Sequence, residues 1–306
     1  MFQRYFTAPL GALLTAGLAL LGAAPAQAQT DLLGDLEKTA PAAAKREVVQ
    51  ATFKGTHLIN SQTVETEGPG TLNFMIQHRF GTINQGPYEF FGLDQAVLRL
   101  SFEYGLTDKV ALGLGRSSIG KTFDGFVKYR ALRQTTGPGA VPVSVTLFAS
   151  SAIMTERFKG DDVLTRTTGS RLAYTYQALI ARKFSPRLSV QLMPTVVHRN
   201  YVALSTDHND VYALGLGFRQ KITKRIAFTG DYFYLLPSTK SVGMRNALGL
   251  GFDFETGGHV FQLHFTNAQG MTESHFIPQT TGNFFAGDVY FGFAIARNFT
   301  VKSNMH

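Results

Sequence analysis

Cysteine is absent from the 306 residues of this chain, and charged residues make up only 16% of it. Without cysteine, disulfides, thiolate metal sites and covalent attachment of c-type haem are excluded. After residue 28, no apolar run approaches the roughly 18 residues of a membrane-spanning helix. The net charge of +8 comes from basic residues scattered among acidic ones, so nucleic acid is not an expected partner. A preference for anions or lipopolysaccharide phosphates is a hypothesis that this charge suggests.

The first residues have the features of a secretory signal peptide. Arg4 supplies a positive n-region, Leu10 to Gly22 form a short apolar h-region, and Ala26-Gln27-Ala28 is a small-residue cleavage site. We therefore expect the mature chain to start at Gln29. The alternative, an N-terminal membrane anchor, fits the short run less well, and no cysteine is present nearby to carry a lipid.

The chain is rich in Phe, Tyr and Gly, with 26, 11 and 31 residues, which favours closely packed strands and an aromatic girdle. The clearest strand signal is Ala247 to Phe265, where bulky apolar residues alternate with small or polar ones on both sides of Thr256-Gly257-Gly258. Period 2 around a Gly-Gly turn predicts a β-hairpin. The bulky face carries no charge, which is typical of a strand with lipid on one side and a crowded or wet interior on the other.

Period-2 alternation recurs from Thr71 to Phe299, and the connections alternate between short turns and longer polar segments. Bacterial outer-membrane barrels have short periplasmic turns and long outer loops. If Thr107-Asp108-Lys109 is a periplasmic turn, the chain forms an antiparallel transmembrane β-barrel of about twelve strands with both ends periplasmic. Val48 to Asn60 alternates only weakly, and a barrel of about 14 strands that includes this segment is the competing prediction.

The predicted organisation has three parts: a signal peptide at residues 1–28, a segment at 29–70, and the outer-membrane β-barrel at 71–300. Residues 29–47 are expected to form a short helix and a linker, because a leucine-containing stretch is interrupted by Pro41. The whole 29–70 segment is a candidate periplasmic arm, linker or lumen plug. As a plug, it would bring Lys54 and His57 within reach of acidic residues in the lumen.

Six short motifs occur in order along the mature chain. They are Gly55 to Asn60 (GTHLIN), Tyr88 to Gln95 (YEFFGLDQ), Gly115 to Ser118 (GRSS), Lys121 to Gly125 (KTFDG), Pro142 to Phe148 (PVSVTLF) and Gly257 to Asn267 (GGHVFQLHFTN). Together they resemble a bacterial family described as a membrane-bound β-barrel domain of unknown function. The resemblance covers roughly Ala51 to Thr300. It implies an outer-membrane barrel and no catalytic residues, so none are carried over.

Motifs that suggest chemistry have simpler interpretations in this chain. The runs GLGLGR, GLGFRQ and GLGFDF lie within predicted strands, whereas nucleotide-binding glycine loops join a strand to a helix. Asp207, His208 and Asp210 lie on a predicted outer loop without the spacing of a closed metal site. Ser274 and His275 are adjacent but on a loop, and no nucleophile elbow is present. We expect a protein that is not an enzyme, with no metal, no cofactor and no catalytic residue.

Charged residues on the interior faces of the predicted strands need partners or water. Mutual salt bridges across a narrow barrel and a hydrated, charge-lined channel are the two interpretations of this set. For His264, beside Gln262, we expect a structural hydrogen bond. The predicted lumen-facing residues are Arg79, Arg99, Glu103, Asp124, Lys128, Arg130, Arg219, Asp231, Asp253 and His264.

The most distinctive connection is Tyr88 to Gln95, which contains three aromatic residues and follows Gly86-Pro87. We expect a short helix that caps the barrel mouth or folds into it. A binding site for a partner or ligand and a packed loop that merely closes the top are the two interpretations. The residues of the candidate mouth-loop site are Tyr88, Glu89, Phe90, Phe91 and Asp94.

Two function classes remain open for a barrel in the bacterial outer membrane, where lipid is the first partner. One is a restricted channel or transporter for small solutes. The other is a non-conducting structural or interaction barrel that anchors a periplasmic or surface protein. Single-channel conductance separates them, because only the first passes current. Since Val48 to Asn60 is long enough to enter a lumen of about twelve strands, we expect an occluded barrel with low conductance.

Overall fold

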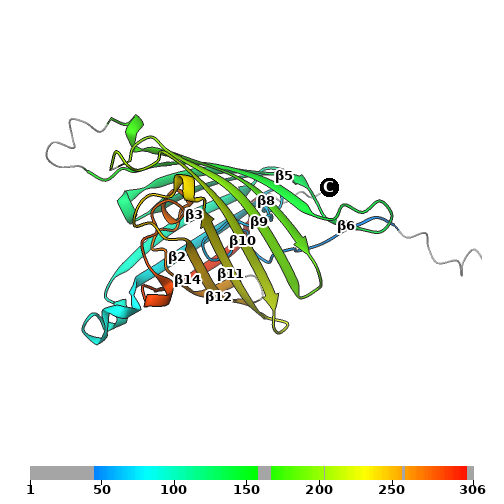
Figure 1. Ribbon diagram of the computed structural model, residues 1–306. Helices are drawn as coiled ribbons and strands as arrows, with labels where there is room; N and C mark the ends of the chain where they lie inside the picture. The colour runs from blue at the N-terminus through cyan, green and yellow to red at the C-terminus, as the bar shows by residue number, and fades with distance from the viewer. Residues whose placement is uncertain (1–44, 158–166, 203, 257–258, 302–306) are drawn as a thin grey trace, which may run out of the picture. The chain divides into compact units, whose positions relative to one another are not determined.

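The protein is described by a computed structural model that covers residues 45–157, 167–202, 204–256 and 259–301. The signal peptide and the helix expected near residue 32 lie outside these ranges. Twelve antiparallel strands close into a barrel (Figure 1), which confirms the predicted fold. The barrel strands are β2 (Thr71–Thr82), β3 (Ala96–Gly105), β4 (Val110–Ser117), β5 (Phe123–Leu132), β7 (Ser144–Ile153), β8 (Leu172–Lys183), β9 (Leu188–Arg199), β10 (Asp210–Lys221), β11 (Ile226–Leu235), β12 (Ala247–Thr256), β13 (His259–Thr266) and β14 (Tyr290–Thr300).

The last barrel strand pairs with the first, so every strand has two neighbours. β14 runs antiparallel to β2, from Tyr290 opposite Thr82 to Thr300 opposite Thr71. Closure removes the free sheet edges that an open sheet would expose, and it satisfies the backbone hydrogen bonds without water. The competing prediction of a larger barrel is wrong. β1 (Glu47–Val48) pairs instead with β6 (Thr135–Thr136) in a separate two-stranded sheet.

Each strand presents its two faces as the alternation predicts. In β12, Leu248, Leu250, Phe252 and Phe254 point outward, and the intervening Gly249, Gly251 and Asp253 are buried inside. The exposed side chains of the outer wall are mainly Leu, Phe, Tyr and Val, as a surface in contact with lipid requires. Among the described residues, no helix is both long and apolar enough to cross a membrane.

The connections fall into a short class at one end of the barrel and a longer class at the other. Residues 45–51 and 68–70 and the end of β14 lie at the short-turn end, which is the periplasmic end in barrels of this type. The longer connections carry short helices. These are η1 (Ile83–Gln85), η2 (Pro87–Gly92), η3 (Ile119–Lys121), η4 (Gly169–Arg171), η5 (Pro237–Thr239), α3 (Glu273–Phe276) and η6 (Phe284–Ala286).

The outward face of β12 makes a stability prediction possible. Leu250→Arg places a charge on the lipid face in the middle of a strand, and we expect it to cost about 2–4 kcal/mol of unfolding free energy. Leu132→Arg, at the periplasmic end of β5, is the matched control and is expected to cost about 1 kcal/mol or less. Urea unfolding in lipid vesicles measures both. Equal stability of Leu250→Arg and the parent would contradict the face assignment.

Candidate functional site

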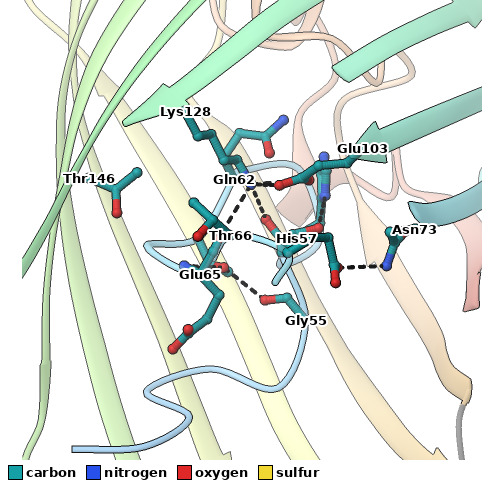
Figure 2. Close-up of polar contacts among 12 residues, drawn as sticks. Gly55, His57, Gln62, Glu65, Thr66, Asn73, Glu103, Lys128 and Thr146 are labelled. Atoms are coloured by element: carbon teal, nitrogen blue, oxygen red, sulfur yellow. Dashed lines mark hydrogen bonds and ion pairs between the residues drawn. The ribbon is translucent and has the colours of Figure 1, made fainter. Parts of the chain in front are cut away.

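A hairpin formed by residues 52–67 lies inside the barrel, where most of its residues are buried, and is the centre of the candidate site (Figure 2). Ahead of it, the chain is attached to the periplasmic rim by the β1–β6 pairing. Lys183 Nζ also donates there to the carbonyls of Gln50 (2.8 Å) and Ala51 (3.1 Å). The hairpin turns back on itself through Leu58 N to Ser61 O and Thr63 N to Thr56 O. We call residues 52–67 the lumen hairpin.

The tip of the lumen hairpin is held by Asp231, which projects inward from β11. Its carboxylate accepts four hydrogen bonds, from the backbone N–H and side-chain amide of Asn60 (both 2.7 Å) and from the backbone N–H (2.9 Å) and hydroxyl (3.0 Å) of Ser61. Asp231 is almost fully buried. A buried carboxylate needs such donors, and here the hairpin supplies them.

Arg79, on β2, holds the same tip from another part of the wall. Its guanidinium donates to the carbonyl of Ile59 (3.2 Å) and to Asn60 Oδ1 (2.7 Å). It also donates to the carbonyls of Ala268 (2.8 Å) and Gly270 (2.5 Å), in the connection between β13 and β14. One buried cation therefore joins the barrel wall, the hairpin tip and an outer connection.

Both limbs of the hairpin are bonded to inward-facing residues of several strands (Figure 2). Lys128 Nζ, on β5, donates to the carbonyl of Thr56 (3.1 Å) and lies 3.3 Å from Oε1 of Glu103 on β3. Thr146 on β7 donates to the carbonyl of Val64, and Gln191 on β9 accepts from the Val64 N–H. The hairpin also packs through apolar side chains, because Phe53, Leu58 and Val64 belong to one buried cluster with wall residues such as Phe148 and Met193.

The connection between β13 and β14, residues 267–289, folds into the outer end of the lumen. We call it the inward loop. Its helix α3 is buried, and Phe276 meets Phe233 of β11 edge to face, with ring centroids 5.1 Å apart. Gln62 of the hairpin donates to Glu273 of α3 at 3.1 Å. The inward loop and the lumen hairpin thus meet inside the barrel.

Ion pairs within the wall account for most of the other interior charges. Arg99 binds Asp124 at 2.5 Å, and Arg219 binds both Asp253 (3.4 Å) and Glu255. Arg130, only partly buried, lies 3.7 Å from Glu65 of the hairpin. All ten residues that the sequence places in the lumen point inward, and nine of them are buried. The structure brings them together in pairs or against the hairpin, not in one open charge-lined channel.

The histidines differ from expectation. Neither ring nitrogen of His264 finds a hydrogen-bond partner among the described residues, so the predicted hydrogen bond is wrong. Lys54 pairs with Glu255 at 3.7 Å, whereas His57 Nδ1 contacts only Thr56 Oγ1, at 3.2 Å. His275 Nδ1 contacts Thr272 Oγ1 at 2.6 Å. Among the described residues, no group of three or more potential ligands is arranged to hold a metal ion.

The prediction that the mouth loop, residues 88–95, caps the barrel mouth or folds into it is wrong. Tyr88 is 93% exposed, and Phe90 and Phe91 are exposed beside it. Both phenylalanines have positive φ, 46° and 56°, an unfavourable conformation for bulky residues. Glu89 is half-buried and Asp94 exposed. The loop projects beyond the barrel (Figure 1), and the inward loop, with its buried helix α3, is the connection that folds inward instead.

Several residues that build the site were not identified from the sequence. Asn60, Ser61 and Gln62 at the hairpin tip, and Glu273 on α3, are uncharged or lie outside predicted strands, so alternation gave no reason to select them. The run Asn60-Ser61-Gln62-Thr63 was the one available signal. It is a cluster of small polar side chains that suits a tight turn bonded to polar walls.

No curated protein matches the chain. Among solved structures, the NanC porin is similar to this chain with a TM-score of 0.46 at 9% sequence identity. The match covers 76% of this chain and 100% of the NanC chain. The KdgM porin has a TM-score of 0.44 at 9% sequence identity, and the match covers 75% of this chain and 99% of the KdgM chain. The outer membrane protein Omp33 of Acinetobacter baumannii has a TM-score of 0.41 at 10% sequence identity, and the match covers 75% of this chain and 98% of the Omp33 chain.

A family model matches residues 53–299, a range that begins within the lumen hairpin and ends one residue before the end of β14. The matched range therefore includes the complete barrel and nearly all of the hairpin. The closed barrel with an apolar outer wall is the form in which proteins of the bacterial outer membrane cross it. The chain belongs to the family described as Membrane bound beta barrel domain (DUF5777).

Proposed function

We propose that this protein is a restricted outer-membrane channel for small solutes, described here in its closed state. The observation that carries the proposal is the seating of the lumen hairpin by polar contacts to wall residues from β2, β5, β7, β9 and β11. The hairpin occupies the interior that a solute would cross. In the open state it leaves that interior, fully or in part.

Polar seating supports a removable closure. Each neutral hydrogen bond contributes a net of about 0.5–1.5 kcal/mol and each bond to a charged group such as Asp231 about 1.5–3 kcal/mol, because water replaces the partner when the groups separate. Wall groups such as Gln191 and Thr146, and the hairpin carbonyls that they bind, become hydrated when the hairpin leaves. The apolar part of the seating is confined to a few side chains, mainly Phe53, Leu58 and Val64, and exposing them to a wet lumen is the hydrophobic cost of opening.

The test is conductance in planar bilayers. The intact mature protein is expected to be almost silent, and removal of the hairpin is expected to produce steady current steps. The channel would be contradicted if the intact protein, the form without the hairpin and a form without both the hairpin and the inward loop all passed no current. That result would favour the alternative class, a non-conducting barrel.

Glu67 makes the seating dependent on pH. Burial raises the pKa of Glu67 from its usual 4.5 to about 7, and the charge of Glu103 adds to the rise. The seated carboxyl therefore holds its proton more tightly than a hydrated one. Its contribution to seating is fully present below about pH 4.5 and is lost as the pH rises through about 7. We expect the hairpin of the folded barrel to become roughly tenfold or more accessible to protease at pH 8 than at pH 5.

Glu67→Gln is the control for this pH dependence. Its amide is neutral at every pH, and its one oxygen can keep one of the two bonds that the native carboxylate accepts from Asn73 and Asn298. Protease accessibility of the Glu67→Gln hairpin should change much less between the two pH values. The same pH dependence in both proteins would assign the effect to another group.

The exposed mouth loop favours a second candidate function, attachment of a surface protein at the outer rim. Asn84 Nδ2 donates to Asp288 Oδ1 at 2.7 Å, which ties the mouth loop to the end of the inward loop. There Phe285 is 90% exposed. Together with Tyr88, Phe90 and Phe91 it forms an aromatic group at the rim, and exposed aromatic residues of this kind mark interaction sites.

Photo-crosslinking in intact cells tests this second function. A photoreactive residue at Tyr88 is expected to give a discrete protein adduct. The same residue at Leu98, on the lipid-facing side of β3, is the control and should give lipid adducts only. Lipid adducts alone at both positions would overturn the surface-partner proposal and leave the channel proposal unaffected.

A further inference from the structure

A cavity of about 150 Å³ lies at the periplasmic mouth of the barrel, where the chain enters the lumen. Residues 51–54 form one side of it. The other side comes from the turn between β8 and β9 and from the periplasmic ends of β8, β9, β10 and β12. Among the described residues that line it, five are cationic and one is a carboxylate. These charged residues are Lys54, Lys183, Arg187, Arg219, Lys221 and Glu255.

The strand register explains why the wall cations gather at this point. Ser189 on β9 lies opposite Lys183 of β8 on one side and opposite Arg219 of β10 on the other. Residues opposite each other in antiparallel strands share a face of the sheet, and Ser189 and Arg219 are buried on the inner face. Lys221 has the same parity as Arg219, and its backbone N–H donates to the carbonyl of Arg187 at 2.7 Å. The register therefore brings three cations onto the inner face, with Arg187 beside them.

Two carboxylates balance two of the five cations. Arg219 binds Asp253 at 3.4 Å and also binds Glu255. Lys54, from the hairpin side of the cavity, lies 3.7 Å from Glu255. The charges of Arg219 and Lys54 are therefore compensated within the protein.

The other three cations have no carboxylate partner among the described residues. Lys183 Nζ donates to two neutral backbone carbonyls, those of residues 50 and 51. The side chains of Arg187 and Lys221 form no hydrogen bond or ion pair with any described residue. Three like charges thus border one small space, where an anion lowers their mutual repulsion.

We propose that this cavity binds the phosphate group of a small periplasmic solute, with Lys183, Arg187 and Lys221 as its charged contacts. Lysine binds phosphate as a point charge, and arginine binds it through charge-assisted hydrogen bonds. Lysine and arginine side chains also line pores that select anions or phosphate. Since the wall cations lie on the inner face, the ligand reaches them from the aqueous side and not from the lipid.

A phosphate bound in this cavity favours the closed state. Thr52, Phe53 and Lys54 of the lumen hairpin line the cavity together with the wall, so the complete site exists only while the hairpin is seated. A ligand that binds one of two states more tightly shifts the population toward that state. This effect rests on the proposed channel function, in which the hairpin leaves. The binding itself does not, because the cavity is present in the closed barrel.

Binding is tested by isothermal titration calorimetry on the full mature protein in detergent, at neutral pH and fixed ionic strength. The probes are inorganic phosphate and, for comparison, acetate and glucose. The variants are Arg187→Gln and Lys221→Gln, each of which removes one charge from the cavity. Lys109→Gln, on the exposed turn between β3 and β4, removes the same charge from another part of the periplasmic rim and is the matched control.

Phosphate is expected to bind about tenfold or more tightly than acetate, because it carries more charge, and glucose is expected to bind least. Each cavity variant should lose about tenfold in phosphate affinity, and Lys109→Gln should lose almost nothing. Equal affinity for phosphate and acetate would overturn the phosphate assignment. Equal losses in all three variants, or no phosphate binding by the parent, would overturn the site.

The effect on the hairpin is measured by protease cleavage at pH 8, where we expect the hairpin to be more accessible than at low pH. Phosphate at about ten times its dissociation constant should reduce hairpin cleavage roughly tenfold in the parent and in Lys109→Gln. The same phosphate concentration should protect Lys221→Gln much less. Unchanged cleavage despite measured binding would overturn the coupling and keep the site. Phosphate binding by a barrel that never conducts would keep the site and reject the channel.

Discussion

Deletion of residues 29–68 is expected to convert a nearly silent barrel into one that passes steady current steps. The deleted segment includes the whole lumen hairpin. Twelve strands enclose a space wider than the interior of an eight-stranded barrel, which side chains alone fill, and narrower than an open porin. Without the hairpin, Asp231, Lys128 and Gln191 lose partners, and water is expected to hydrate them.

The inward loop limits the size of these steps. It remains in place through the contacts of Arg79 with the carbonyls of Ala268 and Gly270 and through Phe276 against Phe233. Replacing residues 269–281 by a short Gly-Ser linker in the deletion variant should therefore increase the conductance further. Deletion of residues 29–44 alone, which leaves the hairpin intact, is the matched control and should stay silent.

A cross-link offers an independent check of the deletion, because the chain contains no other cysteine. A Cβ added at Gly249 would lie 2.6 Å from Cγ2 of Ile59, so the pair Ile59→Cys and Gly249→Cys is close enough to be bridged. Oxidation should keep the barrel silent under conditions that open the reduced form. Equal currents in the oxidised and reduced forms would contradict a closure by the hairpin.

Asp231→Asn is expected to release the hairpin tip while the barrel stays folded. The one oxygen of asparagine can keep the three bonds that a single carboxylate oxygen accepts from Asn60 N and Ser61, but its amide nitrogen would face the side-chain amide of Asn60, so two donors would meet. Arg79, nearby, would also lose a compensating charge. Removing one partner from such a buried charged group costs about 3 kcal/mol or more, which shifts the closed–open equilibrium by roughly a hundredfold.

Asp124→Asn is the matched control for this substitution. Asp124 is also a buried, inward-facing aspartate, but its hydrogen bonds are to Arg99 of the wall. Its loss should lower the urea midpoint without opening the barrel. Asp231→Asn should raise the open probability and the cleavage of the hairpin by protease. A silent Asp231→Asn protein with a protease-resistant hairpin would show that the tip contacts do not hold the closure.

Most of the fold could be predicted because strand alternation has a period of two. A shift of one residue moves every side chain to the opposite face, so the pattern of Leu248, Leu250 and Phe252 against Gly249 and Gly251 allows one assignment only. The same parity places Arg79, Arg99 and Asp231 inside. The mouth loop was predicted less well, because a loop has no such period and its aromatic residues fit a packed or an exposed position equally.

The sequence by itself determined which residues face lipid, which face the lumen, and that the strands form a closed barrel with both ends at the short-turn side. These properties follow from neighbours along the chain, since parity and turn length are local. The tertiary structure alone decided how the lumen is filled. Asp231 meets Asn60 across 171 positions of sequence, and Gln62 meets Glu273 across 211. Such contacts arise only after closure, when strands distant in sequence surround one interior and buried polar groups must find partners within it.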